Sequence, residues 1–289
     1  MEEEKTRKNV REGYAKIAKE GFCCSPTTSC CGSPTTYEEL STKMGYTEEE
    51  LKSIPEGSSL CLGCGNPVAL ASLEEGETVI DLGSGAGVDC FLAAKKVGER
   101  GKVIGVDMTP EMIDKARENA RKGNYGNVEF RLGEIENLPV ADNTADVIIS
   151  NCVINLSPKK KRAFKEAFRA LKPGGRLMVS DIVLLKELPE AIKKRAHPAS
   201  CVKGAIMKDK YIEAIEQAGF QDVKIIKETQ YSFEDLVNDP NARVIVANSN
   251  KNTQELKSVS ELEEESKEIV KETLISTTSI NVSATKPLK

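Results

Sequence analysis

Short apolar runs alternate with longer amphipathic segments between residues 77 and 184. The runs ETVIDL, KVIGVD and ADVIIS have the length of buried strands, whereas segments such as VDCFLAAKKVG carry apolar residues at helical spacing. NVEFRLGE and GRLMVSDIV are two further runs of strand length. Strands that alternate with helices are joined by right-handed crossovers, so the pattern predicts an α/β fold. We expect a doubly wound, mostly parallel sheet of seven strands with helices on both faces.

The chain after residue 208 predicts how this sheet ends. DKYIEAIEQAGF has helical spacing, and the runs DVKIIKE and ARVIVANSN are expected to pair as antiparallel strands at one sheet edge. The segment beyond residue 250 is polar and acidic in its middle, which indicates a disordered tail or, at most, one loose helix. We therefore expect three parts: a cysteine-rich cap and lead-in over residues 1–74, the sheet domain over 75–249 with a substrate-covering insertion at about 182–210, and the tail over 250–289.

Composition narrows the class of partner. The 289 residues carry a formal net charge of −4, with basic residues spread along the chain, which disfavours nucleic acids and anionic membranes. The chain has no apolar run of membrane-span length and no apolar signal segment near residue 1, so we expect a cytoplasmic protein that acts on a small molecule. Its nine cysteines should be mostly reduced there, which favours soft-metal or redox chemistry over structural disulfides.

The turn DLGSGAG after the first predicted strand is the first motif that carries chemistry. Gly83, Gly85 and Gly87 let the backbone lie against a ligand at a helix N-terminus, although a plain tight turn explains them equally well. Asp107 ends the second strand, where its carboxylate can accept hydrogen bonds from both hydroxyls of a ribose. Asp81 would repel phosphate and suits an ammonium group. Together these residues favour a nucleoside cofactor with a charged amine over a dinucleotide.

Further motifs give this domain a resemblance to a known superfamily. FRLGEIE leaves the third predicted strand and PGG precedes the fifth, as in the class I S-adenosylmethionine-dependent methyltransferases, which the chain resembles over about residues 75–248. The resemblance implies a Rossmann-like fold and S-adenosylmethionine as the cofactor. It also implies these cofactor-binding residues: Asp81, Gly83, Ser84, Gly85, Gly87, Asp107, Met108, Ile135, Glu136 and Asn151.

Three cysteines from distant positions are expected near the acceptor site. Cys152 follows the fourth strand in SNCVINL, Cys64 lies between glycines in LGCGNP, and Cys201 lies in HPASCVKG. By itself, Cys152 fits a small buried hydrophobic residue. The acceptor site of the superfamily lies over the carboxyl ends of the fourth and fifth strands. The two other segments can fold over the cofactor methyl group, so the three thiols can converge there.

These cysteine motifs, together with GRLMVSDIVLLKELPEAI, resemble the arsenite S-adenosylmethionine methyltransferases. The resemblance implies that Cys64, Cys152 and Cys201 are the catalytic ligands of As(III), which the protein methylates in arsenic detoxification. Arsenic(III) is soft, prefers thiolate sulfur and keeps a lone pair that acts as the nucleophile. No general base is then needed, which agrees with a chain that has a single histidine. A thiol reductant, such as thioredoxin or a small thiol, is the implied partner.

The other cysteines leave alternatives open. Four of them fit arsenic capture, disulfide exchange with the active site, or a structural zinc site that their adjacency disfavours: Cys23, Cys24, Cys30 and Cys31. Cys61 forms a CxxC motif with Cys64 and is either redox active or a spare ligand. We expect Cys90 to pack in the core and His197 to have no role.

Two other functions fit the same sequence. A methyltransferase of a small organic acceptor, such as a quinone or sterol precursor, would need a wide apolar pocket and no thiols. A non-catalytic binding protein for soft metals would keep the fold without turnover. Incubation with arsenite, labelled cofactor and a thiol, followed by a search for methylated arsenic, separates the three functions.

Overall fold

The computed structural model describes residues 2–20, 45–60, 62–188, 190, 201–230, 243–247, 254–258 and 263–288. Several residues singled out by the sequence lie outside these ranges: Cys23, Cys24, Cys30, Cys31, Cys61 and His197. In the described part of the chain, no helix combines the length and the apolar character that a bilayer crossing requires.

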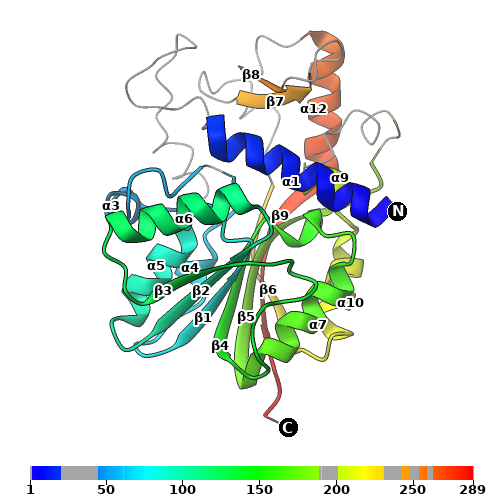
Figure 1. The fold of residues 1–289 in the computed structure, drawn as a ribbon. Helices are drawn as coiled ribbons and strands as arrows, with labels where there is room; N and C mark the ends of the chain where they lie inside the picture. The colour runs from blue at the N-terminus through cyan, green and yellow to red at the C-terminus, as the bar shows by residue number, and fades with distance from the viewer. Residues whose placement is uncertain are drawn as a thin grey trace.

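One seven-stranded sheet forms the centre of the protein, and its strand order is β3-β2-β1-β4-β5-β9-β6 (Figure 1). Its first five strands pair in parallel: β1 (Thr78–Leu82), β2 (Lys102–Asp107), β3 (Val128–Leu132), β4 (Ala145–Asn151) and β5 (Leu171–Leu184). β9 (Thr277–Thr285) lies between β5 and β6 (Gln221–Thr229) and is antiparallel to both. The predicted fold class, with its antiparallel edge, is confirmed.

Helices cover both faces of this sheet because its strands carry apolar side chains on both sides. In β1, Val79 packs into one core and Ile80 into the other, and neither side chain is exposed. One core lies under α4 (Pro67–Leu70), α5 (Val88–Val97) and α6 (Pro110–Lys122), and the other under α7 (Lys160–Ala170) and α10 (Lys208–Glu216) (Figure 1). The two layers of helices leave the carboxyl ends of the parallel strands at one edge of the sheet.

Shorter elements lie around this frame. They are α3 (Glu48–Lys52), the 3₁₀ helix η1 (Ile154–Leu156), α9 (Cys201–Gly204) and α12 (Glu264–Ser276). β7 (Arg243–Ala247) and β8 (Gln254–Ser258) form a separate antiparallel sheet.

The C-terminal segment corrects two predictions. The run ARVIVANSN does not pair with β6 but supplies β7, and the expected tail over 250–289 contains β8, α12 and the sheet strand β9. β9 has the sequence TTSINVSAT, in which only Ile280, Val282 and Ala284 are apolar, and all three lie in the core with at most 1% of their surface exposed. They alternate with polar residues at the period of a strand, so a low apolar content concealed a buried strand.

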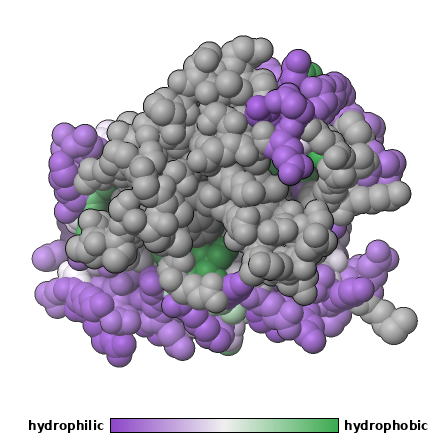
Figure 2. All heavy atoms as spheres, turned by 90° about the horizontal axis from the view of Figure 1, so that it is seen from above, coloured by the Kyte–Doolittle hydropathy of each residue, from purple (hydrophilic) through white to green (hydrophobic). Residues whose placement is uncertain are grey.

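Helix α1 (Glu2–Glu20) lies across the carboxyl edge of the sheet (Figure 1). Arg7 and Arg11 each lie 3.5 Å from the Glu134 carboxylate, beyond the end of β3. Two further ion pairs hold its ends, Glu3 with Lys159 and Lys19 with Glu111, both at 2.8 Å. Seen from above, hydrophilic side chains gather around the rim of this face and hydrophobic ones show only in small areas between them (Figure 2). The edge of the sheet is therefore covered by a helix that is attached through charged groups.

Candidate active site

The glycine-rich turn joins β1 to α5 in a conformation that requires glycine. Gly83 and Gly87 have φ values of +71° and +102°, and a Cβ atom at Gly83 would clash with the side chain of Val153. Around Gly85, by contrast, a Cβ atom would have no neighbour within 4 Å. The Gly85 amide donates a hydrogen bond to Asp107 Oδ2 at 3.0 Å, so the turn is fixed to the end of β2. The backbone thus has an open face beside the predicted ribose-binding carboxylate.

A cavity of about 110 Å³ lies above this turn. Eight of the predicted cofactor residues line it: Gly83, Ser84, Gly85, Asp107, Met108, Ile135, Glu136 and Asn151. Asp81 and Gly87 are not among the described residues that line it. The cavity is smaller than typical ligand pockets of about 300 Å³ or more, and α1 contributes Arg7, Val10 and Tyr14 to its wall. A shift of α1 would enlarge it.

The polar groups of the cavity fit a nucleoside ligand. Backbone amides orient the Asp107 carboxylate in the wall of the cavity, where Gly85 donates to Oδ2 and Thr109 donates to Oδ1 at 2.8 Å, so an acceptor for ribose hydroxyls lies there. The Ser84 hydroxyl is buried and has no hydrogen-bond partner among the described residues. A buried hydroxyl without a partner is costly, so a polar ligand group beside it is expected. These residues therefore fit S-adenosylmethionine.

Of the two acids closest in sequence to the glycine-rich turn, Asp89 lines the cavity and Asp81 does not. Asp81 is buried behind the turn, where the Cys90 thiol donates a hydrogen bond to it at 3.2 Å, and burial raises its pKa well above the usual range. Asp89 lines the cavity, and burial raises its pKa to about 6. Asp89 was not predicted from the sequence, although it is a carboxylate in the first turn of the helix that follows the glycine-rich turn. Cys90 packs in the core as expected.

Asn151 lines the cavity, but its amide holds the loop that carries Cys64. Its Oδ1 accepts a hydrogen bond from the Cys64 amide at 2.9 Å, and its Nδ2 donates to the Gly65 carbonyl at 2.7 Å. The same Nδ2 lies 2.9 Å from the Tyr46 hydroxyl and 3.1 Å from Asp89 Oδ2. Tyr46 in turn donates to Asp89 Oδ1 at 2.8 Å. Asn151 therefore joins the cofactor cavity to the Cys64 loop, a role that its position after β4 did not reveal.

The structure brings the three predicted cysteines together. The Cys152 and Cys201 sulfurs are 3.1 Å apart, and the Cys201 thiol also donates to the Cys152 carbonyl at 3.0 Å. The ligand atoms of Cys64, Cys152 and Asp181 all lie within 4.8 Å of one another. All three cysteines are free thiols, and Cys152 also lines the cofactor cavity. Cys152 is therefore the centre of the thiol cluster and the link to the cavity.

Local backbone geometry explains how two of these thiols meet. Cys152 has a φ of +60°, which is unusual for a residue with a side chain, and its amide donates to the Ser180 carbonyl of β5 at 2.7 Å. Cys201 begins α9, which packs on η1 so closely that a Cβ atom on Gly204 would clash with the Asn155 carbonyl. The strained turn after β4 and the glycine of α9 thus bring the two sulfurs into contact.

Burial and hydrogen bonds raise the pKa values of two thiols of the cluster, Cys64 and Cys152. Hydrogen bonds with Cys201 and Cys64, together with burial, hold the pKa of Cys152 well above its usual range, and burial raises the pKa of Cys64. Asp181 is fully buried beside them and accepts hydrogen bonds from the Tyr211 hydroxyl at 3.1 Å and the Asn155 side chain at 2.7 Å. Burial raises the pKa of Asp181 to about 7. When Asp181 is ionised, its negative charge opposes ionisation of the Cys64 thiol.

Tyr14 of α1 completes the wall between the two halves of the site. Desolvation raises the pKa of Tyr14 well above its usual range, so a protonated hydroxyl lies in the wall of the cavity. The sequence analysis assigned no role to this residue.

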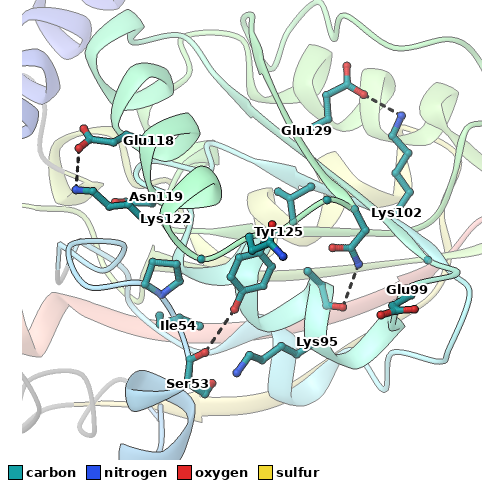
Figure 3. Close-up of a pocket in the computed structure, with 18 of the residues that line it drawn as sticks. Ser53, Ile54, Lys95, Glu99, Lys102, Glu118, Asn119, Lys122, Tyr125 and Glu129 are labelled. Carbon is teal, nitrogen blue, oxygen red and sulfur yellow. Dashed lines mark hydrogen bonds and ion pairs between the residues drawn. The ribbon is translucent and has the colours of Figure 1, made fainter.

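A larger concavity of about 1670 Å³ lies over the opposite ends of α5 and α6 (Figure 3). Its charged side chains pair with each other, Glu118 with Lys122 at 2.7 Å and Glu129 with Lys102 at 2.8 Å. Tyr125 projects into it and donates to the Ser53 carbonyl at 3.4 Å (Figure 3). None of the described residues that line it is a cysteine, and it lacks the buried polar groups of the smaller cavity. We assign the chemistry to the smaller cavity and the thiol cluster.

Known methyltransferases are similar to this chain in sequence. Residues 73–219 match the family described as Methyltransferase domain. The chain is 50% identical over 231 residues to an arsenite methyltransferase of Halobacterium salinarum, a match that covers 77% of this chain and 59% of the relative. It is 34% identical over 236 residues to an arsenite methyltransferase of Aquipseudomonas alcaligenes, with coverage of 78% and 65%. The chain thus spans about three fifths of the length of the curated relatives it matches.

A solved structure extends the match to three dimensions. The crystal structure of an arsenic(III) S-adenosylmethionine methyltransferase from Chlamydomonas reinhardtii aligns with a TM-score of 0.58 and 30% sequence identity. The alignment covers 86% of this chain and 73% of that one. The chain belongs to the arsenite methyltransferase family of class I S-adenosylmethionine-dependent methyltransferases.

Proposed function

We propose that this protein is an arsenite methyltransferase, which transfers the methyl group of S-adenosylmethionine to As(III) bound by Cys64, Cys152 and Cys201. The observation that carries the proposal is the position of Cys152. Its sulfur contacts the Cys201 sulfur and lies within 4.8 Å of the Cys64 sulfur. Cys152 also lines the cofactor cavity. A substrate atom held by these thiols lies beside the place where the cofactor binds.

The protonation state of the thiols suits arsenite as the incoming substrate. Arsenite at neutral pH is As(OH)₃, and each thiol that binds it forms one As–S bond and breaks one As–O bond. The thiol proton leaves with the displaced hydroxide as water, so thiols with raised pKa values can react without a separate base. Three such exchanges leave As(III) in a pyramidal site with a lone pair on its open side. The thiols thereby both bind and orient the nucleophile.

The chain provides the groups that would hold the cofactor. When bound, S-adenosylmethionine supplies a methyl group activated by a sulfonium sulfur. Asp107 would accept the ribose hydroxyls, Ser84 would bond to a polar group of the ligand, and Asp89 lies where a carboxylate can face its ammonium. α1 would close the cavity from water through Val10 and Tyr14. These residues position and shield the reactants, so their role is not acid–base chemistry.

A thiol reductant, such as thioredoxin or a small thiol, is proposed as the partner of the reaction. Methylation uses the arsenic lone pair and formally oxidises As(III) to As(V). A return to the trivalent state needs two electrons, which two thiols provide when they form a disulfide. The 3.1 Å separation of the Cys152 and Cys201 sulfurs supports a thiol pair able to take part. The reductant then restores the free thiols.

The proposal is tested by replacing each of the three cysteines with serine. Cys152→Ser should lower the rate of arsenite methylation by about 100-fold or more, because arsenic loses a ligand and its alignment, while the dissociation constant for S-adenosylmethionine stays within twofold. The assay measures methylated arsenicals formed from arsenite, radiolabelled cofactor and a thiol. The matched control is Cys90→Ser, since this buried cysteine contacts Asp81 and lies outside the thiol cluster.

The outcomes separate the competing functions. Unchanged turnover in Cys152→Ser would refute arsenite methylation by this site. Methylation of an organic acceptor that survives thiol alkylation would favour the quinone or sterol class of substrate. Tight arsenite binding without any methylated product would favour a sequestration protein.

A further inference from the structure

The polar face of β9 lies against the loop that carries Cys64. Three of its residues occur at alternate positions on that face: Ser279, Asn281 and Ser283. Ser279 and Asn281 have only 6% and 4% of their surface exposed. Polar side chains buried to this extent are stable only when they form hydrogen bonds, so their partners indicate what the strand holds in place.

Ser279 bonds directly to Cys64. Its hydroxyl donates a hydrogen bond to the Cys64 carbonyl oxygen at 3.0 Å, across 215 positions of sequence. One side chain of β9 therefore holds the backbone of Cys64.

The rest of the loop is held by its close fit against three strands. A Cβ atom on Gly65 would lie 2.7 Å from Ser180 Oγ and 3.1 Å from Asn281 Nδ2, and Asn281 itself donates to the Ser180 hydroxyl. On the other side, the Asn151 side chain accepts a hydrogen bond from the Cys64 amide and donates one to the Gly65 carbonyl. The loop is thus fixed by Asn151 at the Cys64 amide and by Ser279 at the Cys64 carbonyl.

We infer that Ser279 is a positioning residue for arsenic binding, which sets the place of Cys64 relative to Cys152 and Cys201. The inference rests on the proposed function for its consequence but on the Ser279 to Cys64 contact for its geometry. Cys201 is placed by the packing of α9 on η1, whereas Cys64 lies on a loop whose carbonyl is held by β9. A strand near the C-terminus then determines whether the site offers As(III) three ligands or two.

The experiment compares Ser279→Ala, Ser279→Thr and Ser283→Ala in the full-length protein. Ser279→Ala removes the hydrogen bond, Ser279→Thr restores a hydroxyl, and Ser283→Ala removes a hydroxyl from the same face four residues along the strand. The dissociation constants for arsenite and S-adenosylmethionine, the kcat and KM of methylation, and the hydrogen–deuterium exchange of the peptide spanning residues 62–68 are measured for each. The exchange measurement needs no arsenic and reports on the loop alone.

We expect Ser279→Ala to raise the arsenite dissociation constant and KM about fivefold, as one lost hydrogen bond predicts, and to speed exchange in the Cys64 loop. Affinity for S-adenosylmethionine should stay unchanged, Ser279→Thr should restore arsenite affinity, and Ser283→Ala should behave as wild type. Unchanged loop exchange and arsenite affinity in Ser279→Ala would overturn the inference. So would an equal loss in Ser283→Ala, which would indicate general damage to β9. Wild-type protein that binds no arsenite would refute the proposed function, while the exchange data would still decide the role of Ser279.

Discussion

The hydroxyl of Tyr46 offers a sharp test of the hydrogen-bond network behind the Cys64 loop. Tyr46 is 3% exposed, donates to Asp89 Oδ1 at 2.8 Å and accepts from Asn151 Nδ2 at 2.9 Å. Tyr46→Phe removes this hydroxyl and leaves the ring in place. The Asp89 carboxylate, which is 4% exposed, then keeps Asn151 Nδ2 as its remaining side-chain donor among the described residues.

The size of the effect should depend on pH, because Asp89 titrates within an accessible range. Burial raises its pKa from 3.8 to about 6, so the folded state holds the proton more tightly than the unfolded state does. The contribution of Asp89 to stability is therefore most favourable below pH 3.8 and declines as pH rises to about 6, by about 3 kcal/mol in total. A hydrogen bond to a carboxylate contributes about 1.5–3 kcal/mol and one to a neutral carboxyl about 1 kcal/mol. Tyr46→Phe should thus cost about 2 kcal/mol at pH 7.5 and about 1 kcal/mol at pH 5.0.

Urea unfolding of wild-type and variant protein at the two pH values measures this difference. Tyr125→Phe is the matched control, because its hydroxyl makes a long 3.4 Å hydrogen bond to a backbone carbonyl and has no carboxylate partner in the described structure. The control should lose about 0.5 kcal/mol or less at both pH values. A loss in Tyr46→Phe that is the same at pH 5.0 and pH 7.5 would refute the argument that this hydroxyl stabilises an ionised Asp89.

Two further predictions concern the segments at the ends of the chain. Glu134→Gln removes the ion-pair partner that Arg7 and Arg11 share, so α1 should open more readily. In stopped-flow fluorescence at low salt, S-adenosylmethionine should then associate with the variant about two to five times faster than with the wild type. Salt at 0.5 M should abolish this difference, because it screens the ion pairs. Equal association rates at low salt would show that α1 does not control entry. Ile280→Ala should lower the free energy of unfolding by about 2–5 kcal/mol, because the side chain is fully buried and its strand, β9, lies between β5 and β6. A change below about 0.5 kcal/mol would mean that the C-terminal segment is not part of the sheet.

The residues that meet beside the cofactor cavity could be predicted from the sequence, because they lie at or just after the ends of predicted strands. Gly83 and Gly85 follow an apolar run, and Asp107 ends the next one, so a parallel sheet brings them to the same edge. Asp89 was not predicted, because which of the two nearby acids faces the cavity depends on how α5 is rotated about its axis. Asp81 points behind the turn toward Cys90, whereas Asp89 faces the cavity.

The thiol cluster could not be predicted from the hydrophobic pattern alone. The place of Cys152 follows from the end of β4, but the approach of Cys64 and Cys201 depends on two segments outside the regular strand and helix alternation. Their convergence was expected from a family resemblance, and the contacts that produce it are tertiary: Asn151 on the Cys64 loop and Asn155 against Gly204 of α9. β9 could not be found by apolar content, because six of its nine residues are polar, and one of them, Ser279, bonds to the Cys64 loop.

The position of Asn151 links the two halves of the site physically. Asn151 and Cys152 are neighbours at the end of β4, so the cofactor cavity and the central thiol share one short stretch of backbone. The Asn151 amide is also committed to the Cys64 loop through its two hydrogen bonds. Any ligand that shifts Asn151 in the cavity must therefore disturb either the Cys64 loop or its bonds to Tyr46 and Asp89. The cofactor cavity and the Cys64 loop therefore meet at this one side chain.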